Sequence, residues 1–310
     1  MPVDGQCCDP FAALGRHEPR RFVPEDIDLG EAAQVVALCE KLLARKISSA
    51  ADLERWLLDS SELESALDQH GAILYIRMTC QTDDPERAKA YQSFIENVVP
   101  AVKPLADKAN RMYLAARKQF PLDARRYEVY DRTVESDVAL FRQENVPLAT
   151  EVALLEQKYQ TVVGAMTVEF QGQERTLPAM GKFLEEPDRA LREEAWRLVA
   201  RRRLADRDAI DELYDQMVGL RDRLARNADC DGFCEFIFRE MHRFDYRPAD
   251  CFAFHEAVEK HVLPLLNGIH ERRRTEMKVD RLRPWDLAAD PRGRPPLRPF
   301  DKPEELIAGV

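Results

Sequence analysis

Apolar side chains recur along most of the chain at intervals of three and four residues, the spacing that places them on one face of an α-helix. This pattern predicts helices from about residue 123 to 141, from 148 to 164 and from 208 to 227. Another helix is expected to begin at Pro248, because proline is favoured in the first helical turn, where no intrahelical hydrogen bond is lost. We therefore expect an all-α protein, built as an array of many helices.

Residues that can cap a helix mark further starts. Asp28 precedes a run of apolar residues in helical spacing, and Pro187-Asp188 opens a similar run. Ser49 with Asp52 resembles a capping box, in which the two residues bond each other's backbone amide through their side chains. We expect amphipathic helices after all three signals.

Prolines interrupt one of the predicted helices. Asp84-Pro85 is a start signal, and the helical pattern that follows runs past Pro100 and Pro104 towards Phe120. A proline inside a helix removes a hydrogen bond and clashes with the preceding turn. The sequence therefore predicts two helices joined by a bend.

One segment alternates apolar and polar residues instead. Residues 166–177, MTVEFQGQERTL, have this alternation around Gln171-Gly172, a pair suited to a tight turn. The expected fold is thus all-α with one short β-hairpin near residues 166–177.

The composition changes between residues 281 and 303. This stretch is too rich in proline for a regular helix, and its prolines are Pro284, Pro291, Pro295, Pro296, Pro299 and Pro303. It is typical of an extended connector. A connector of this length normally leads to another segment, so we expect the chain to be incomplete at Val310.

Composition and charge exclude some classes of function. The chain has 310 residues, 45% of them apolar and 33% charged, with 12 glycines, which favours long helices in a globular protein. Its net charge of -10 argues against a nucleic-acid or anionic-membrane surface. No signal peptide or membrane-spanning run is present, and the 7 cysteines fit reduced thiols, so we expect a cytoplasmic protein. We assign no role to Cys7 and Cys8.

The stretch FHEAVEKHV, residues 254–262, resembles the start of a zinc-binding helix. In H-E-x-x-H the histidines are four residues apart, so both reach one metal ion. His255 and His261 are six apart, which on a regular helix separates them by about 120° around the axis and about 9 Å along it. We predict that His255, Glu256 and His261 serve the fold, with one histidine on the surface and the other packed against a neighbouring helix.

Other candidate sites are equally weak. The spacing of Cys230, Cys234, His242 and Cys251 matches no common zinc module, so buried free thiols are the expectation. The run 201–203 of three arginines has acidic neighbours and is typical of a solvated helix end. No glycine-rich phosphate loop or nucleophile elbow occurs. The sequence therefore identifies no catalytic, cofactor-binding or metal-binding residue.

Several segments resemble the oligoendopeptidase F family of zinc metallopeptidases, which are relatives of thimet oligopeptidase. The similar segments are RALREEAWRLVARRR at 189–203, LRDRLARNADCDGF at 220–233, FREMHRFDYRPADCFAFHEAV at 238–258 and RLRPWDL at 281–287. The hairpin, RRFVPEDIDL and DLERWLLDSSEL are similar to segments of the N-terminal half of that family. The resemblance divides the chain into an N-terminal helical domain, 1–185, and the first helical part of a peptidase domain, 186–310.

The resemblance implies a mostly helical enzyme that hydrolyses short peptides in a deep channel. In the family, zinc is held by the histidines of H-E-x-x-H and a later glutamate, and these belong to a part of the protein beyond Val310. No catalytic or metal-binding role is therefore assigned to a numbered residue, no zinc is expected on this chain, and we predict that the chain alone is inactive. Surface left uncovered by truncation is expected to cause self-association. The alternative is a non-enzymatic helical module that binds a peptide or a protein.

Overall fold

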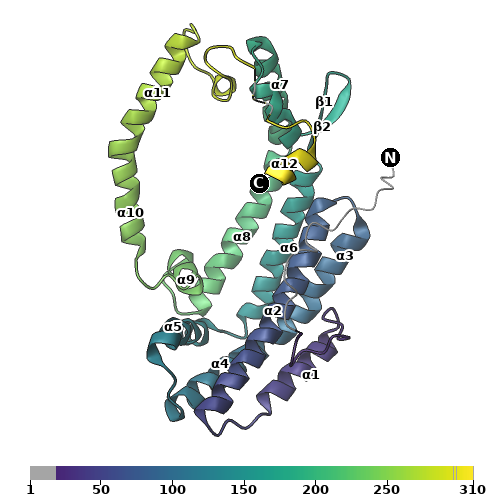
Figure 1. The fold of residues 1–310 in the computed structure, drawn as a ribbon, viewed down its shortest axis with the longest axis vertical. Coiled ribbons are helices and arrows are strands. Elements are labelled where there is room, and N and C mark those ends of the chain that lie inside the picture. Colours follow the sequence, from purple (N-terminus) through teal and green to yellow (C-terminus); the bar gives the residue numbers. More distant parts are fainter. Residues whose placement is uncertain (1–18, 296, 298, 310) are drawn as a thin grey trace. The chain divides into compact units, whose positions relative to one another are not determined.

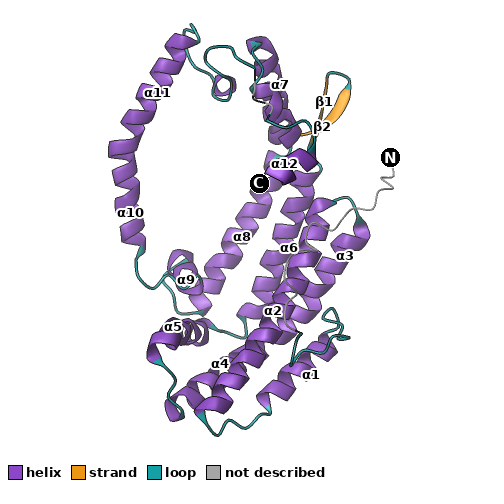
Figure 2. Ribbon diagram, viewed as in Figure 1, coloured by secondary structure: helices purple, strands orange, loops and turns teal. Residues whose placement is uncertain are grey.

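Helices make up most of the structure, as the apolar spacing predicts (Figures 1 and 2). The computed structural model describes residues 19–295, 297 and 299–309, so Cys7 and Cys8 lie outside it. Within these residues a single pair of strands accompanies the helices. The prediction of an all-α fold with one short hairpin is confirmed.

By its internal contacts the chain divides into two compact units. The first comprises the described part of Met1–Ile76 together with Ala90–Val138, and the second comprises Arg77–Lys89 and Ala139–Val310. The helices from which the first unit is built are α1 (Ala32–Leu43), α2 (Ala50–Cys80), α3 (Pro85–Ser93), the π-turn η1 (Phe94–Val98), α4 (Val99–Gln119) and α5 (Ala124–Leu140). Three of them, α2, α3 and α5, continue into the second unit.

The core of the first unit lies where α1 packs against α2 and α4. Val35, Leu53 and Tyr113 are at most 1% exposed there. The indole of Trp56, also buried, donates a hydrogen bond from Nε1 to the carbonyl of Leu42 at 3.1 Å, which links α2 to the end of α1. Burial of apolar surface at this junction is what stabilises the unit.

The predicted helix starts have different outcomes. Asp188 caps α7 (Arg189–Ala205) as predicted, because its Oδ1 accepts a hydrogen bond from the amide of Ala190 at 2.9 Å. The prediction for Asp28 is wrong: α1 begins at Ala32 after Glu31, and the Asp28 carboxylate instead accepts from the amide of Gly30 at 2.8 Å. An Asx-type turn before the helix satisfies this side chain locally.

The capping box at the start of α2 forms with a shifted partner. The Ser49 hydroxyl accepts from the Asp52 amide at 3.1 Å. The Asp52 carboxylate reaches the amide of Ser48, at 3.2 Å, one residue earlier than a capping box requires. Two side-chain-to-amide hydrogen bonds therefore stabilise the start of α2.

A bend between two helices was expected near Pro100. The structure instead has a π-turn just before this proline. The π-turn η1 ends two residues before Pro100, and Pro104 lies inside α4. Because proline has no amide hydrogen, the Glu96 carbonyl within η1 receives no α-helical bond from Pro100. The wider turn accommodates this loss and lets α3, η1 and α4 follow one another without a loop.

The second unit contains the hairpin and the remaining helices. In chain order its elements are α6 (Asn145–Gly164), β1 (Thr167–Phe170), β2 (Gln173–Thr176), the 3-10 segment η2 (Pro178–Leu184), α7 (Arg189–Ala205), α8 (Arg207–Asn227), α9 (Phe233–Glu240), α10 (Pro248–Ala257), the π-turn η3 (Val258–Val262), α11 (Leu263–Glu276), the 3-10 turn η4 (Pro284–Asp286) and α12 (Pro303–Gly309). Apolar side chains of α6 and α8, most of them leucines, form one small core, and those of β1, η2 and α7 form another.

The hairpin turns where the sequence places it. The strands pair antiparallel, with Thr167 opposite Thr176. Gln171 and Gly172 have φ angles of 54° and 70°, the left-handed values that a two-residue hairpin turn needs. Glycine adopts such a value without strain.

One helical stretch of the second unit is largely exposed. None of the residues from Pro248 to Glu276, in α10, η3 and α11, is buried. Its exposed large apolar side chains are Phe252, Phe254, Val262, Leu263, Leu265, Leu266 and Ile269. These exposed side chains are too apolar for a helix that faces water along its whole length.

The start of the predicted connector is folded against α7. Asp286, in η4, is 0% exposed, and its carboxylate accepts hydrogen bonds from Arg189 at 2.9 and 3.0 Å and from Arg192 at 3.1 Å. The neighbouring Trp285 is also buried and lies 5.4 Å from Trp196 between ring centroids. The expectation of an extended connector is wrong for these residues, because the arginines of α7 hold them in a tight turn.

Candidate functional site

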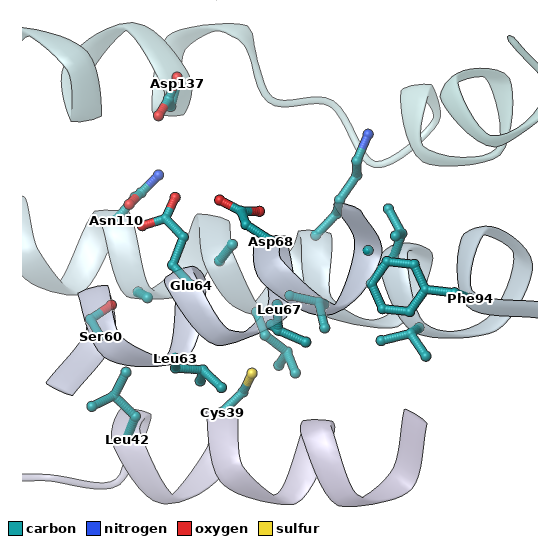
Figure 3. A pocket seen from close by; sticks show the side chains of 18 of the residues that line it. Cys39, Leu42, Ser60, Leu63, Glu64, Leu67, Asp68, Phe94, Asn110 and Asp137 are labelled. Carbon is teal, nitrogen blue, oxygen red and sulfur yellow. The ribbon is translucent and has the colours of Figure 1, made fainter. Parts of the chain in front are cut away.

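A cavity of about 810 Å³ lies within the first unit, between α2, η1, α4 and α5, with the end of α1 at its base (Figure 3). Its volume falls within the range of about 300–1,000 Å³ typical of small-molecule sites. It is a candidate binding site.

Helical spacing directs the side chains of α2 into this cavity. Ser60, Glu64 and Asp68 follow one another at intervals of four residues and so lie on one face of α2. Asn110 of α4 and Asp137 of α5 come from the opposite side. Figure 3 shows the carboxylates of Glu64, Asp68 and Asp137 turned towards the same space, with the Asn110 amide near Glu64.

The floor of the cavity is apolar. Leu42, Leu63 and Leu67 line it, and Cys39 and Phe94 lie beside them (Figure 3). Polar groups and apolar groups therefore occupy different sides of the same space.

A glycine sets the distance between α2 and η1. A side-chain carbon at Gly71 would lie 2.9 Å from the Phe94 ring, closer than such atoms approach in proteins. Gly71 thus lets the ring pack directly on the backbone of α2. The ring in turn forms part of the cavity wall.

The acidic groups alter the protonation of their neighbours. Burial in the cavity raises the pKa of Glu64, and the nearby Asp68 and Asp137 carboxylates raise it further. Burial, followed by Glu64, Asp137 and Asp131, raises the pKa of Tyr130 to about 12. Lys103 is the one basic side chain among the residues that line the cavity, so the site has an excess of negative charge.

Hydrogen bonds join α5 to α4 and α2. The hydroxyl of buried Tyr113 donates to Asp131, which also accepts from Arg117 Nη2 at 3.1 Å. The Tyr127 hydroxyl donates to Glu54 at 3.0 Å. Burial first, and then the Asp131 carboxylate, raise the pKa of Tyr113, so its hydroxyl stays protonated and able to donate.

The histidines of FHEAVEKHV belong to the second unit. His255 is in α10 and His261 in η3, and both are exposed. Their exposure corrects the expectation that one of them packs against a neighbouring helix. The π-turn also means that the regular helix assumed for their separation is interrupted between them.

The cysteines of the other candidate set differ in their surroundings. Cys230 is buried, and its Sγ lies 3.6 Å from the Arg239 guanidinium. Burial raises the pKa of its thiol. Cys251 is half-buried, whereas Cys234 is exposed, which corrects the expectation of a buried thiol at that position. All the cysteines in the described part of the chain are free.

The described residues do not fit a zinc ion. No three His, Cys, Asp or Glu side chains among them come together in a way that could hold a metal. This applies to the carboxylates of the cavity as well as to the histidines of α10 and η3. Because the described residues offer no set of metal ligands, they support no metal-dependent catalytic step.

Sequence reasoning missed the cavity, although part of its signal is visible. Ser60, Glu64 and Asp68 form a polar stripe that borders the apolar stripe of α2. A stripe of this kind is usually solvated, so it predicts a site only when the facing helices are known.

The run 201–203 of three arginines lies at the end of α7, where Arg202 pairs with Asp206.

Comparisons with known proteins identify two family regions in the chain. The Peptidase M3 N-terminal domain matches residues 28–141, and Peptidase family M3 matches residues 182–294. No curated protein matches the chain. Among the described residues, every helix is too short or too polar to cross a lipid bilayer.

Solved structures share the fold. A protein described as oligoendopeptidase F is 24% identical, with a TM-score of 0.83 over 94% of this chain and 51% of that chain. PZ peptidase A, solved with an inhibitor, is 24% identical, with a TM-score of 0.83 over 93% and 51%. A protein from Bacillus anthracis described as oligoendopeptidase F is 19% identical, with a TM-score of 0.80 over 93% and 52%. The chain thus spans about half the length of these structures.

Proposed function

The chain belongs to peptidase family M3, and on that premise we propose that it is the N-terminal portion of a zinc metallo-oligopeptidase that hydrolyses short peptides in a deep channel. The observation that carries the proposal is the order of the two family regions, the N-terminal domain at 28–141 and the peptidase region at 182–294. In functional terms, residues 1–185 are the N-terminal helical domain and residues 186–310 are the first helical part of the peptidase domain.

The exposed face of α10, η3 and α11 supports this proposal. A helical stretch without a buried residue and with seven exposed large apolar side chains needs a covering partner. In the proposed enzyme the covering partner is the part that carries the zinc ligands. The described residues of this chain offer no zinc ligand set, so in this proposal the chain by itself hydrolyses no peptide.

The test is a peptidase assay on the purified 310-residue chain. A quenched fluorogenic peptide is incubated with the chain, with and without added zinc, beside a mock purification as contaminant control. We expect no turnover above that control. Turnover that a zinc chelator inhibits would contradict the proposed inactivity of this chain.

A second experiment tests the family assignment of the activity. The gene is read on the 3′ side of the codon for Val310, and any product that contains H-E-x-x-H is purified and assayed with the same peptide. We expect chelator-sensitive hydrolysis. A glutamate-to-glutamine change in that motif should abolish it, because the motif's glutamate activates the zinc-bound water.

The alternative is a non-enzymatic module in which the helical surface binds a peptide or a protein partner. The cavity of the first unit is the observation that favours it, since such a site needs no catalytic group. A gene without H-E-x-x-H in this reading frame would favour the module over the enzyme. In both cases we place the protein in the cytoplasm, consistent with the free cysteines of the described residues.

A further inference from the structure

We propose that the cavity between α2, η1, α4 and α5 binds an organic cation, a primary ammonium group carried on an apolar aliphatic or aromatic body. The proposal does not depend on the proposed peptidase function, because it concerns a cavity formed wholly by residues of the first unit.

The charge of the cavity selects a cation. Glu64, Asp68 and Asp137 face it with carboxylates, and Lys103 supplies the single opposing charge among the lining residues. Carboxylates that share one space repel each other, and a cation placed among them relieves that repulsion. Burial, and then the repulsion from Asp68 and Asp137, raise the pKa of Glu64.

The lining excludes a metal ion as the preferred cation. The three carboxylates do not form a group that could hold a metal. Aromatic rings accompany them: Tyr91 and Tyr75 lie 5.6 Å apart between ring centroids, and Phe94 and Tyr130 line the same cavity. Aromatic faces attract ammonium groups, so carboxylates and rings together suit an organic cation.

The apolar floor selects the rest of the ligand. Leu42 of α1 and Leu63 and Leu67 of α2 lie on the side of the cavity away from the carboxylates (Figure 3). An ammonium bound at the carboxylates would direct an attached hydrocarbon chain towards this floor. Burial of that chain removes apolar surface from water and so adds to the affinity.

The π-turn η1 gives a further structural reason to expect a binding site at this cavity. Phe94, Ile95 and Val98 belong to this π-turn, and all three line the cavity. A π-turn is less stable than an α-helix and frequently occurs at a functional site. Here it widens the helix at the point where the wall of the cavity is formed.

The experiment is isothermal titration calorimetry on the full chain with three isosteric probes. The probes are 4-phenylbutylamine, which is an ammonium at pH 7.5, the uncharged 4-phenylbutanol and the anionic 4-phenylbutyrate. We expect the amine to bind at least tenfold more tightly than the alcohol and the anion not to bind. Equal binding of amine and alcohol, or no binding of the amine, would overturn the proposal.

Variants locate the binding. Glu64→Gln is expected to weaken amine binding at least about fivefold, and Glu64→Gln with Asp68→Asn to abolish it. Glu135→Gln is the matched control, because Glu135 is an exposed acid of α5 that does not line the cavity. Unchanged amine affinity in Glu64→Gln would place the amine elsewhere and so refute the proposed site.

Stability separates a binding role from a structural one. The folded chain raises the pKa of Glu64, so the ionised carboxylate destabilises the ligand-free fold above that pKa. Glu64→Gln should therefore raise the unfolding midpoint at pH 8 while it weakens amine binding. A lower midpoint would mean that Glu64 supports the fold, against the proposal.

The source of the ammonium is tested last. The dipeptide Phe-Leu with a free amino terminus is compared with its N-acetylated form. If the ligand is a peptide terminus, the free form competes with 4-phenylbutylamine and the acetylated form does not. If neither competes, a free amine is the ligand. Neither result alters the peptidase assay, so failure of one proposal is distinguishable from failure of the other.

Discussion

Arg192 of α7 and Asp286 of η4 form an ion pair that is shielded from solvent on both sides. Arg192 Nη2 lies 3.1 Å from Asp286 Oδ1, and the two side chains are 3% and 0% exposed. The guanidinium of Arg192 also donates hydrogen bonds to the carbonyls of Trp285, Glu186 and Pro187, at 2.8 to 2.9 Å. The pair therefore holds η4 against the start of α7, although more than ninety residues separate the two in sequence.

Removal of one partner should be costly. Asp286→Ala leaves Arg192 buried without its counter-charge, so we expect the free energy of unfolding of the second unit to fall by about 3–5 kcal/mol. Urea unfolding is followed by tryptophan fluorescence in a Trp56→Phe background, which leaves Trp196 and Trp285 beside the site as reporters.

The matched control for this change is Asp208→Ala. Asp208 pairs with Arg207 at 2.8 Å but is 88% exposed, so its loss should alter stability by no more than about 0.5 kcal/mol. Equal effects of the two substitutions would contradict the importance of burial at Asp286.

The same aspartate predicts a dependence on pH. Burial alone would raise its pKa, but hydrogen bonds from Arg189, the Arg283 amide and Arg192 outweigh burial and hold the pKa below its ordinary value. A lowered pKa gives stability that is complete above about pH 4 and is lost as the pH falls through the folded value. The difference in urea midpoint between the wild type and Asp286→Asn should be constant from pH 7 to 5 and shrink below about pH 4. A difference that grows on acidification would show the opposite sign.

Tyr113→Phe should loosen α5 without disturbing the core. The ring is 1% exposed and stays packed, while the hydrogen bond to Asp131 is lost. Because Asp131 keeps its bonds to Arg117, we expect a loss of about 1–2 kcal/mol. Amide hydrogen exchange should become faster in α5 than in α1. Tyr214→Phe is the control, since that ring is 58% exposed, and it should leave exchange in α5 unchanged.

The uncovered face of α10, η3 and α11 should make the chain self-associate. We expect sedimentation velocity at tens of micromolar to show a dimer or a larger species, driven by burial of apolar surface between copies. Phe254→Glu with Leu265→Glu should shift the chain to monomer, because these side chains are 67% and 69% exposed. Leu58→Glu on α2, where the leucine is 65% exposed, is the control and should leave association unchanged. A wild-type chain that is only monomeric would contradict this prediction.

Local features of the fold could be predicted from sequence, and distant ones could not. The Asp188 cap and the turn at Gln171-Gly172 depend on a few consecutive residues, so their sequence pattern is sufficient. Asp28 has the same cap pattern, yet its side chain bonds to Gly30 before the helix begins. Glu64 has the spacing of an ordinary solvated helix charge. Only the packing of α2 against α4 and α5 turns it towards a cavity, and no local pattern contains that information.

The two π-turns have a consequence for the phase of the helices that follow them. Each inserts the equivalent of one residue into an otherwise α-helical path, which rotates every later side chain by about 100° about the axis. In η1 that rotation sets which residues of α4, among them Lys103 and Asn110, face α2 and α5. Deletion of a single residue from Phe94–Val98 would restore a regular helix and turn a different side of α4 inward. Substitutions along this wall would change its chemistry, whereas a deletion would change its register.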